Sequence, residues 1–262
     1  MAMFEYVGDE LDLFANATTW KSYVRSQVAA YVRGRVLEVG AGIGATTRAL
    51  ITPAVTAWVC LEPDARLAAR IRDTIHEVER PEWVTVRVGT VADLDESERF
   101  DAILYIDVLE HIRDDAAEVE SAAGHLSPGG HLIVLSPAHQ WLYSPFDARI
   151  GHFRRYSRKS LRVLGPSRLE LRRLRYLDSV GLLASAANRW LLRSATPGAG
   201  QLAIWDRGMV RVSRLLDPLL AYRIGKSVLG VWRAPAERAD APSAHAVGWM
   251  VGGQEEPSTA ER

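Results

Sequence analysis

Short apolar runs alternate with segments of helical periodicity between residues 35 and 135. Runs this short and this apolar are typical of parallel strands that are buried on both faces. The predicted strands are Arg35–Val39, Thr56–Leu61, Trp83–Val88, Phe100–Ile106 and His131–Leu135, and the predicted helices between them are Ala45–Leu50, Ala65–Val78 and Asp114–Leu126. This alternation predicts an α/β fold in which helices cover both faces of a parallel sheet.

Other segments flank the alternating region. Residues 1–34 carry helical periodicity and predict an N-terminal helical cap. Residues 137–166, rich in His, Tyr, Phe and Arg, predict an inserted substrate segment, and residues 180–223 predict helices that cover the pocket. The elements expected there are strands Leu169–Tyr176 and Ser227–Arg233 and helices Val180–Leu192 and Gln201–Leu220. Residues 35–233 would then form the main domain, and residues 234–262 predict a disordered tail.

Composition narrows the class of protein. The 32 basic residues balance the 32 acidic ones, so no net charge draws the chain to nucleic acid or to an anionic membrane. A single cysteine, Cys60, excludes an internal disulfide and a cysteine-based zinc site. No apolar run is long enough to span a membrane, and the first residues lack the order of a signal peptide. We therefore expect a cytoplasmic protein.

A glycine-rich turn, Gly40-Ala41-Gly42-Ile43-Gly44, follows the first predicted strand. Glycines at such a turn allow the backbone to approach a ligand closely. Glu38 lies inside the strand, where a nicotinamide-binding strand is usually apolar, and Glu62 ends the next strand, where an acid can accept hydrogen bonds from ribose hydroxyls. The turn predicts a nucleoside-containing cofactor, with a nicotinamide dehydrogenase as the alternative.

Residues 35–136 resemble the class I S-adenosylmethionine-dependent methyltransferases. The motifs that carry the resemblance are the glycine turn, Glu62-Pro63-Asp64, Val88-Gly89-Thr90-Val91, Tyr105-Ile106-Asp107-Val108-Leu109-Glu110-His111 and Leu126-Ser127-Pro128-Gly129-Gly130. The resemblance implies a Rossmann-like, doubly wound seven-stranded sheet and S-adenosyl-L-methionine as cofactor. It also implies an enzyme.

The resemblance assigns roles to particular residues. The glycine turn would line the methionine part, and Glu62 would hold the ribose. Thr90 and Val91 would border the adenine, although the family commonly has Asp at the position of Thr90. Tyr105 and Ile106 would close over the cofactor. The full cofactor-binding set is Glu38, Gly40, Ala41, Gly42, Glu62, Thr90, Val91, Tyr105 and Ile106.

The segment 137–166 concentrates groups that can move protons and bind anions. It is similar to a bacterial methyltransferase subgroup associated with envelope-sugar and secondary-metabolite genes. We predict that His152 is a general base oriented by Asp147 or Asp107; alternatively, His152 only satisfies backbone groups of a loop. The predicted catalytic residues are His152, Asp107 and His111, and the predicted substrate-binding residues are His139, Tyr143, Asp147, Arg155 and Tyr156.

Asp107, Glu110 and His111 raise the possibility of a metal. Their spacing places them on one face of a helix, where they could bind a divalent ion, and ubiquinone-pathway O-methyltransferases resemble this stretch. Acids are also favoured at a helix N-terminus without any metal. We favour the second explanation and expect no metal.

Together these features predict a methyltransferase that acts on an oxygen or nitrogen of a small molecule. A secondary metabolite or a sugar-containing intermediate is the expected substrate, without a nucleic-acid partner or a membrane span, and a homodimer is possible. The alternatives are an NAD(P)-dependent oxidoreductase and a non-catalytic cofactor-binding partner protein.

Overall fold

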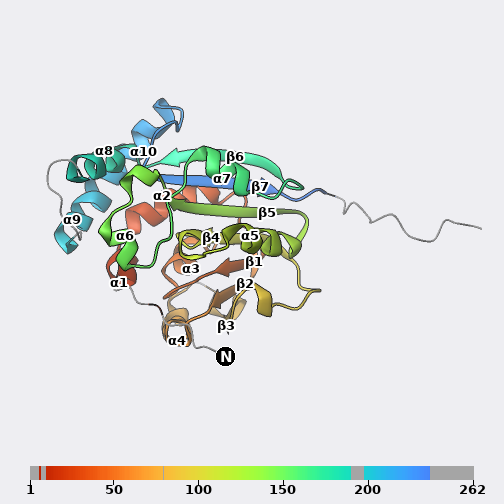
Figure 1. The fold of residues 1–262 in the computed structure, drawn as a ribbon. Coiled ribbons are helices and arrows are strands. Elements are labelled where there is room, and N and C mark those ends of the chain that lie inside the picture. The colour runs from red at the N-terminus through yellow and green to blue at the C-terminus, as the bar shows by residue number, and fades with distance from the viewer. Residues whose placement is uncertain (1–5, 7–9, 79, 190–197, 237–262) are drawn as a thin grey trace, which may run out of the picture.

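A seven-stranded sheet forms the centre of the computed structural model, which describes residue 6 and residues 10–78, 80–189 and 198–236 (Figure 1). The strand order is β3-β2-β1-β4-β5-β7-β6. The first five strands pair in parallel, whereas β7 is antiparallel to both β5 and β6. The strands are β1 Gly34–Val39, β2 Val55–Glu62, β3 Val84–Val88, β4 Phe100–Ile106, β5 Leu126–Pro137, β6 Glu170–Leu177 and β7 Ser227–Arg233.

Helices cover both faces of this sheet, which confirms the predicted Rossmann-like, doubly wound α/β fold. They are α1 Glu10–Ala15, α2 Thr18–Val28, α3 Ala45–Leu50, α4 Ala65–Thr74, α5 Asp115–Gly124, α6 Pro145–Arg149, α7 Arg158–Leu164, α8 Ser179–Ala187, α9 Ala199–Ile204 and α10 Val210–Leu219. No helix in these ranges is long and apolar enough to cross a bilayer.

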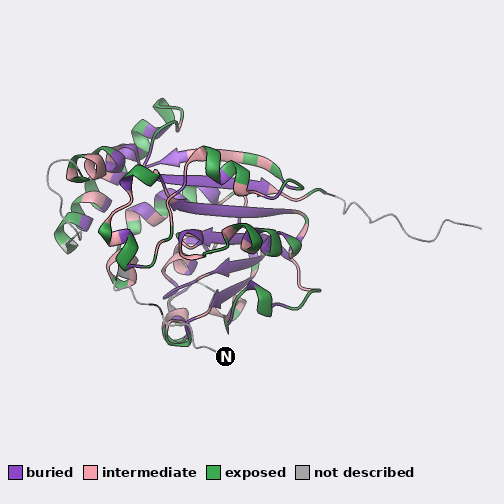
Figure 2. Ribbon diagram, in the orientation of Figure 1, coloured by how far each residue is buried: buried purple, intermediate pink, exposed green. Residues whose placement is uncertain are grey.

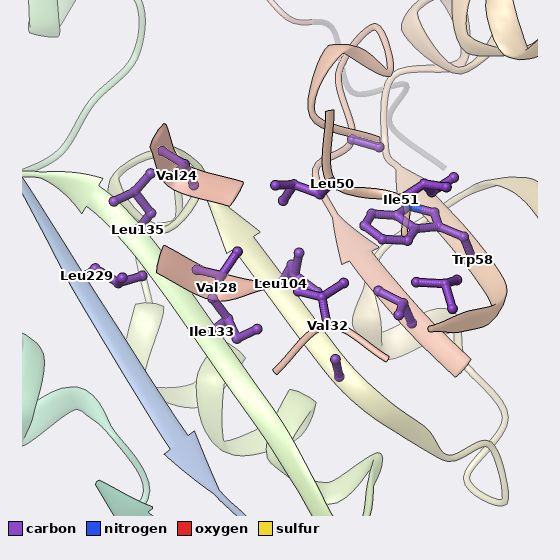
Figure 3. Packing of buried hydrophobic residues seen from close by; sticks show 14 of the residues in the cluster. Val24, Val28, Val32, Leu50, Ile51, Trp58, Leu104, Ile133, Leu135 and Leu229 are labelled. Atoms are coloured by element: carbon purple, nitrogen blue, oxygen red, sulfur yellow. The ribbon is translucent and has the colours of Figure 1, made fainter. Parts of the chain in front are cut away.

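Two apolar clusters form the core, one on each face of the sheet. On one face, side chains of α2 and α3, among them Val24, Val28 and Leu50, pack against Trp58 and Leu104 of the sheet (Figure 3). On the other face, α5 covers β4 and β5, and α7 covers β6 and β7. The strands between the two clusters are buried almost throughout (Figure 2), because both of their faces are covered.

Several element boundaries differ from the prediction. Strand β5 begins at Leu126 and not at His131. The predicted helix Gln201–Leu220 is divided by a π-helical turn at Trp205–Met209, so that α9 and α10 are separate. The predicted helix Ala65–Val78 ends at Thr74 and continues as a 3₁₀ turn. The first helical region forms two helices, because the helical conformation is interrupted between Ala15 and Thr18. Residues 190–192 of the predicted helix Val180–Leu192, and residues 237–262 of the predicted tail, lie outside the described residues.

Candidate active site

A cavity of about 1020 Å³ lies at the carboxyl ends of β1, β4 and β5. Gly40–Ile43 follow β1, Ile106 and Asp107 end and follow β4, and Pro137 ends β5. Other parts of the wall come from α1, α2, α3, α6 and α8, which lie at this edge of the sheet (Figure 1). Open α/β sheets bind their ligands at this edge, and the volume is at the upper end of the usual range of roughly 300–1,000 Å³. The cavity is therefore large enough for a cofactor and a second ligand.

The glycine turn brings bare backbone to the cavity. Gly40 has a φ of +67°, and a Cβ atom there would lie 2.8 Å from Cγ2 of Val108. Gly42 has a φ of +58°. Both conformations disfavour residues with side chains. The turn after β1 therefore keeps a passage for a ligand along Gly40, Ala41 and Gly42, all of which line the cavity.

Glu62 fixes this turn to the end of β2. Its carboxylate accepts hydrogen bonds from the backbone N–H of Gly42 (2.7 Å) and of Asp64 (3.0 Å). Burial raises the pKa of Glu62 to about 7 despite these bonds. Asp64 in turn accepts a hydrogen bond from the backbone N–H of Tyr6, another residue of the cavity wall. Glu62 thus lies beside the turn, as a ribose-binding acid should, although its side chain is not part of the cavity wall.

Glu38 is enclosed in the core behind the turn. Its carboxyl group accepts hydrogen bonds from Thr47 Oγ1 (2.5 Å) on α3 and from Trp58 Nε1 (2.9 Å) on β2. Burial raises its pKa to about 7. The structure therefore places Glu38 as a buried link between β1, α3 and β2, and not on the cavity wall.

Three other residues of the predicted cofactor set lie away from the cavity wall. Val91 is buried in the core, and Thr90 donates its hydroxyl to the carboxylate of Asp93 (2.9 Å). Tyr105 is fully buried, and its hydroxyl donates to Glu118 (2.8 Å) on α5. Its side chain therefore points to the helix and not over the cavity. The part of the predicted set that the cavity brings together is Gly40, Ala41, Gly42 and Ile106.

His152 lies on the opposite wall and is held by Asp147. The Nδ1 atom of His152 is 3.0 Å from Oδ1 of Asp147. Asp147 is fully buried and also accepts two hydrogen bonds from the guanidinium of Arg155 (2.8 and 3.0 Å). Burial alone would raise the pKa of Asp147, but hydrogen bonds from His152 and Arg155 outweigh it and hold the pKa below its usual range. An ionised carboxylate therefore fixes the orientation of the imidazole.

Three further polar groups of the cavity wall surround His152. The ring of His111 is 4.5 Å from that of His152 and nearly perpendicular to it, and burial lowers the pKa of His111 to about 3. Glu110 lies with Oε1 4.0 Å from His152 Nε2, and burial raises its pKa well above the ordinary value. Burial also raises the pKa of Asp107, to about 6. Burial thus disfavours the charged form of all three groups that face His152.

Glu110, His111 and His152 can offer metal-ligand atoms that all lie within 4.8 Å of one another. This group contains two members of the predicted metal trio, but His152 takes the place of Asp107. One member, Glu110, is fully buried, yet neither of its carboxyl oxygens has a hydrogen-bond partner among the residues that the structure describes. One carboxyl group and two imidazoles are ligand types that can bind a divalent ion.

The remaining substrate-segment residues support the loop. Tyr143 donates its hydroxyl to the carbonyl of His152 (2.6 Å), and Tyr156 donates to the carbonyl of Leu109 (3.2 Å). His139 stacks on Tyr176, with Nε2 2.9 Å from the carbonyl oxygen of Gly225. These three predicted substrate-binding residues, Tyr143, Tyr156 and His139, do not line the cavity, whereas Asp147 and Arg155 do.

Two lysines on the cavity wall were missed by the sequence analysis. Burial lowers the pKa of Lys21, on α2, to about 8, against the opposing effect of Asp107. Lys226 lies just before β7, with Nζ 4.7 Å from the ring centroid of Trp205. Both are far in sequence from the glycine turn. The only available signal was the rarity of lysine, since the chain has three in all.

Sequence similarity connects the chain to known methyltransferases. A family model described as a methyltransferase domain matches residues 13–167, which is more than half of the chain. A ubiquinone biosynthesis O-methyltransferase of Xylella fastidiosa is 38% identical over 104 residues, which cover 38% of this chain and 40% of that protein. A protein of the same name from Xanthomonas campestris is 35% identical over 116 residues, covering 43% and 46%. The chain thus spans less than half the length of these curated relatives.

Solved structures show the same fold. The N-methyltransferase NodS of Bradyrhizobium japonicum, in complex with S-adenosyl-l-homocysteine, superposes with a TM-score of 0.55 at 15% identity, covering 89% of this chain and 94% of that one. A putative sarcosine dimethylglycine methyltransferase of Galdieria sulphuraria gives 0.55 at 18% identity, covering 84% and 85%.

The fold, the glycine turn and the family match agree with one another. The backbone passage at Gly40–Gly42 and the adjacent acid Glu62 fit the cofactor of this family. The chain belongs to the methyltransferase-domain family.

Proposed function

We propose that this enzyme methylates an oxygen or nitrogen of a small molecule and that His152 is the general base when the acceptor is a hydroxyl. The observation that carries the proposal is the His152–Asp147 pair, which lies on the wall of the same cavity as the glycine turn. A secondary metabolite or a sugar-containing intermediate is the proposed substrate class. The relatives named as ubiquinone biosynthesis O-methyltransferases support oxygen as the acceptor atom.

When bound, S-adenosylmethionine supplies a methyl group on a sulfonium, which a nucleophile takes by in-line displacement. The protein must position the acceptor and exclude water. A hydroxyl acceptor must also lose its proton. With Nδ1 donating to Asp147, Nε2 of His152 is the unprotonated nitrogen and accepts that proton. An amine that arrives uncharged needs no such base.

The walls of the cavity support an acceptor with apolar parts. Leu11 and Phe14 of α1, Trp20 of α2 and Leu142 line it together with the polar groups around His152. Apolar walls with a few placed polar groups are typical of small-molecule sites. Segments that are distant in sequence enclose this space, among them α1, α6 and α8. This arrangement argues against a nucleic-acid strand as substrate.

The test is methyl transfer to a panel of phenols, catechols, sugars and amines, followed by mass spectrometry of the products. With an accepted hydroxyl substrate, we expect His152→Ala to lower kcat by about 10²–10⁴-fold, the usual contribution of a general base. Binding of S-adenosylhomocysteine, measured by calorimetry, should not change.

The matched control is His125→Ala. His125 is a partly buried histidine that follows α5, with Nδ1 3.2 Å from the carbonyl oxygen of Glu98, and it does not line the cavity. This variant should keep its kcat. If His152→Ala kept most of the turnover, His152 would not be the base and its place in the loop would be structural.

A further inference from the structure

Helix α10 turns its apolar side outward. The apolar residues recur at the spacing of one helix face, and Leu215 and Leu219 are 73% and 81% exposed. The complete stripe is Val212, Leu215, Leu216, Leu219 and Leu220. A surface helix of a globular protein normally buries such a stripe, so this helix is inverted.

The inward side of α10 explains the inversion. Asp217 accepts hydrogen bonds from the hydroxyl of Tyr23 (2.7 Å) and from the backbone N–H groups of Asp178 (2.7 Å) and Ser179 (3.0 Å). Ser213 donates to Asp178 (2.8 Å). The polar residues of α10 are thus required inside the molecule, where they hold the start of α8. These buried hydrogen bonds fix the orientation of the helix, because breaking them would leave buried polar groups without partners.

Neighbouring elements extend the outward apolar stripe. Leu183 of α8, which packs beside α10, is 66% exposed, and Ile204 at the end of α9 is 64% exposed. The three helices lie together at one end of the molecule (Figure 1), and their outer sides are exposed (Figure 2). Clusters of exposed large apolar side chains on a monomer usually mark an interaction surface.

Arginines accompany this stripe without balancing acids. Arg207, Arg211, Arg214 and Arg223 are exposed, and none forms an ion pair with another described residue. The only acids between residues 199 and 224 are Asp206 and Asp217, and both are buried and hydrogen bonded. The surface is therefore apolar and purely cationic.

We propose that the outward side of α10, with the arginines around it, docks on an anionic lipid surface. Leucines that enter the headgroup boundary and arginines that contact anionic headgroups are the two features of interfacial helices. A symmetric dimer through this face is disfavoured, because a two-fold axis would place the arginines of both copies opposite one another.

Docking would bring the cavity next to the lipid. Trp205 and Met209, just before α10, line the cavity, as do Gly181 and Ala184 of α8. Helix α8 and the turn before α10, which adjoin the proposed docking surface, therefore also form part of the cavity wall. A lipid-soluble acceptor could then enter without crossing open water.

The test is co-sedimentation of the full chain with vesicles of equal parts phosphatidylcholine and phosphatidylglycerol, and with vesicles of phosphatidylcholine alone. We expect binding to the mixed vesicles and much weaker binding to the neutral ones. Leu215→Ser combined with Leu219→Ser should weaken binding by about tenfold per leucine. Arg211→Gln combined with Arg214→Gln should weaken binding to the mixed vesicles by about fivefold per arginine.

The matched control is Val163→Ser on α7, at an apolar position that is 78% exposed but outside this surface; its vesicle binding should equal that of the wild type. All variants should keep the wild-type melting temperature and affinity for S-adenosylhomocysteine. The proposal is overturned if the wild type binds neither vesicle, or if the leucine variants bind as the wild type does. It is also overturned if light scattering shows a dimer that the leucine substitutions dissociate, since the surface would then join two copies.

Discussion

Glu38→Gln should remove a defined part of the pH dependence of stability. Glu38 is 2% exposed, and burial raises its pKa from 4.5 to about 7 in the folded chain. Between these two values the folded state binds more protons at this carboxyl group than the unfolded state does. The free energy of unfolding therefore falls as the pH rises through this window. Glutamine cannot ionise, so this part of the fall is absent from the variant.

The size of the effect follows from the shift. A shift of about 2.5 units corresponds to about 3.4 kcal/mol when the group is fully ionised. Between about pH 5.5 and about pH 8.5, the same two pKa values give a loss of about 2 kcal/mol. The amide oxygen of the introduced glutamine can still accept from Thr47 and Trp58, but its NH₂ group has no acceptor there, which costs about 1–3 kcal/mol at every pH. The absolute stability can therefore fall, whereas the slope against pH is diagnostic.

Urea denaturation across this pH range measures both quantities. The curve of the free energy of unfolding against pH should be flatter for Glu38→Gln than for the wild type by about 2 kcal/mol over the range. Some slope should remain, because Glu62 is shifted in the same direction. Glu96→Gln, at an exposed position, should run parallel to the wild type. Parallel curves for Glu38→Gln and the wild type would show that Glu38 is ionised in the folded protein, and the reasoning from burial would fail.

Three further outcomes are expected. Asp147→Asn should lower kcat for a hydroxyl acceptor by at least about 100-fold with little change in cofactor affinity, because an amide oxygen and NH₂ no longer fix the tautomer of His152. Unchanged steady-state kinetics would contradict the orienting role of Asp147. Gly40→Ala should weaken binding of S-adenosylhomocysteine and lower the melting temperature. The added Cβ would lie 2.8 Å from Val108 at a φ of +67°, which gives a strain of about 1–3 kcal/mol. Calorimetry that shows unchanged affinity would refute the role of Gly40 in cofactor binding. Exhaustive EDTA treatment should leave the methyl-transfer rate unchanged, because burial raises the pKa of Glu110 and so disfavours the ionised form that a metal ligand needs. A loss of rate that Mg²⁺ restores would instead assign a metal to the group with His111 and His152.

Most of the fold could be predicted because its signals are local. The predicted strands Phe100–Ile106 and Ser227–Arg233 coincide with β4 and β7, since apolar runs bounded by polar or turn residues define their own ends. The break at Trp205–Met209 had no such signal. Periodicity continues through a π turn, and the cause of the break is tertiary: Asp206 accepts hydrogen bonds from the backbone N–H groups of Thr19 and Trp20 at the start of α2.

The site was predicted less completely because motifs give positions but not side-chain directions. Tyr105 and Ile106 are adjacent on β4, so their side chains point to opposite faces of the sheet. Only Ile106 lines the cavity, whereas Tyr105 enters the core beneath α5. The contribution of Lys21 and Lys226 depends on how α2 and the start of β7 meet over the sheet, which no local pattern contains.

The contacts of His152 bear on a question that the sequence left open, namely whether Asp147 or Asp107 orients this histidine: Nδ1 of His152 lies 3.0 Å from Oδ1 of Asp147. Burial raises the pKa of Asp107 to about 6, and no hydrogen bond offsets this burial. Asp147 is fully buried, but the guanidinium of Arg155 binds both of its oxygens and keeps it ionised. A lasting negative charge in contact with Nδ1 stabilises the imidazolium that forms when Nε2 takes a proton. We therefore infer that Asp147 orients the base. We also infer that Asp107, which lines the cavity and has a pKa of about 6, contacts the acceptor.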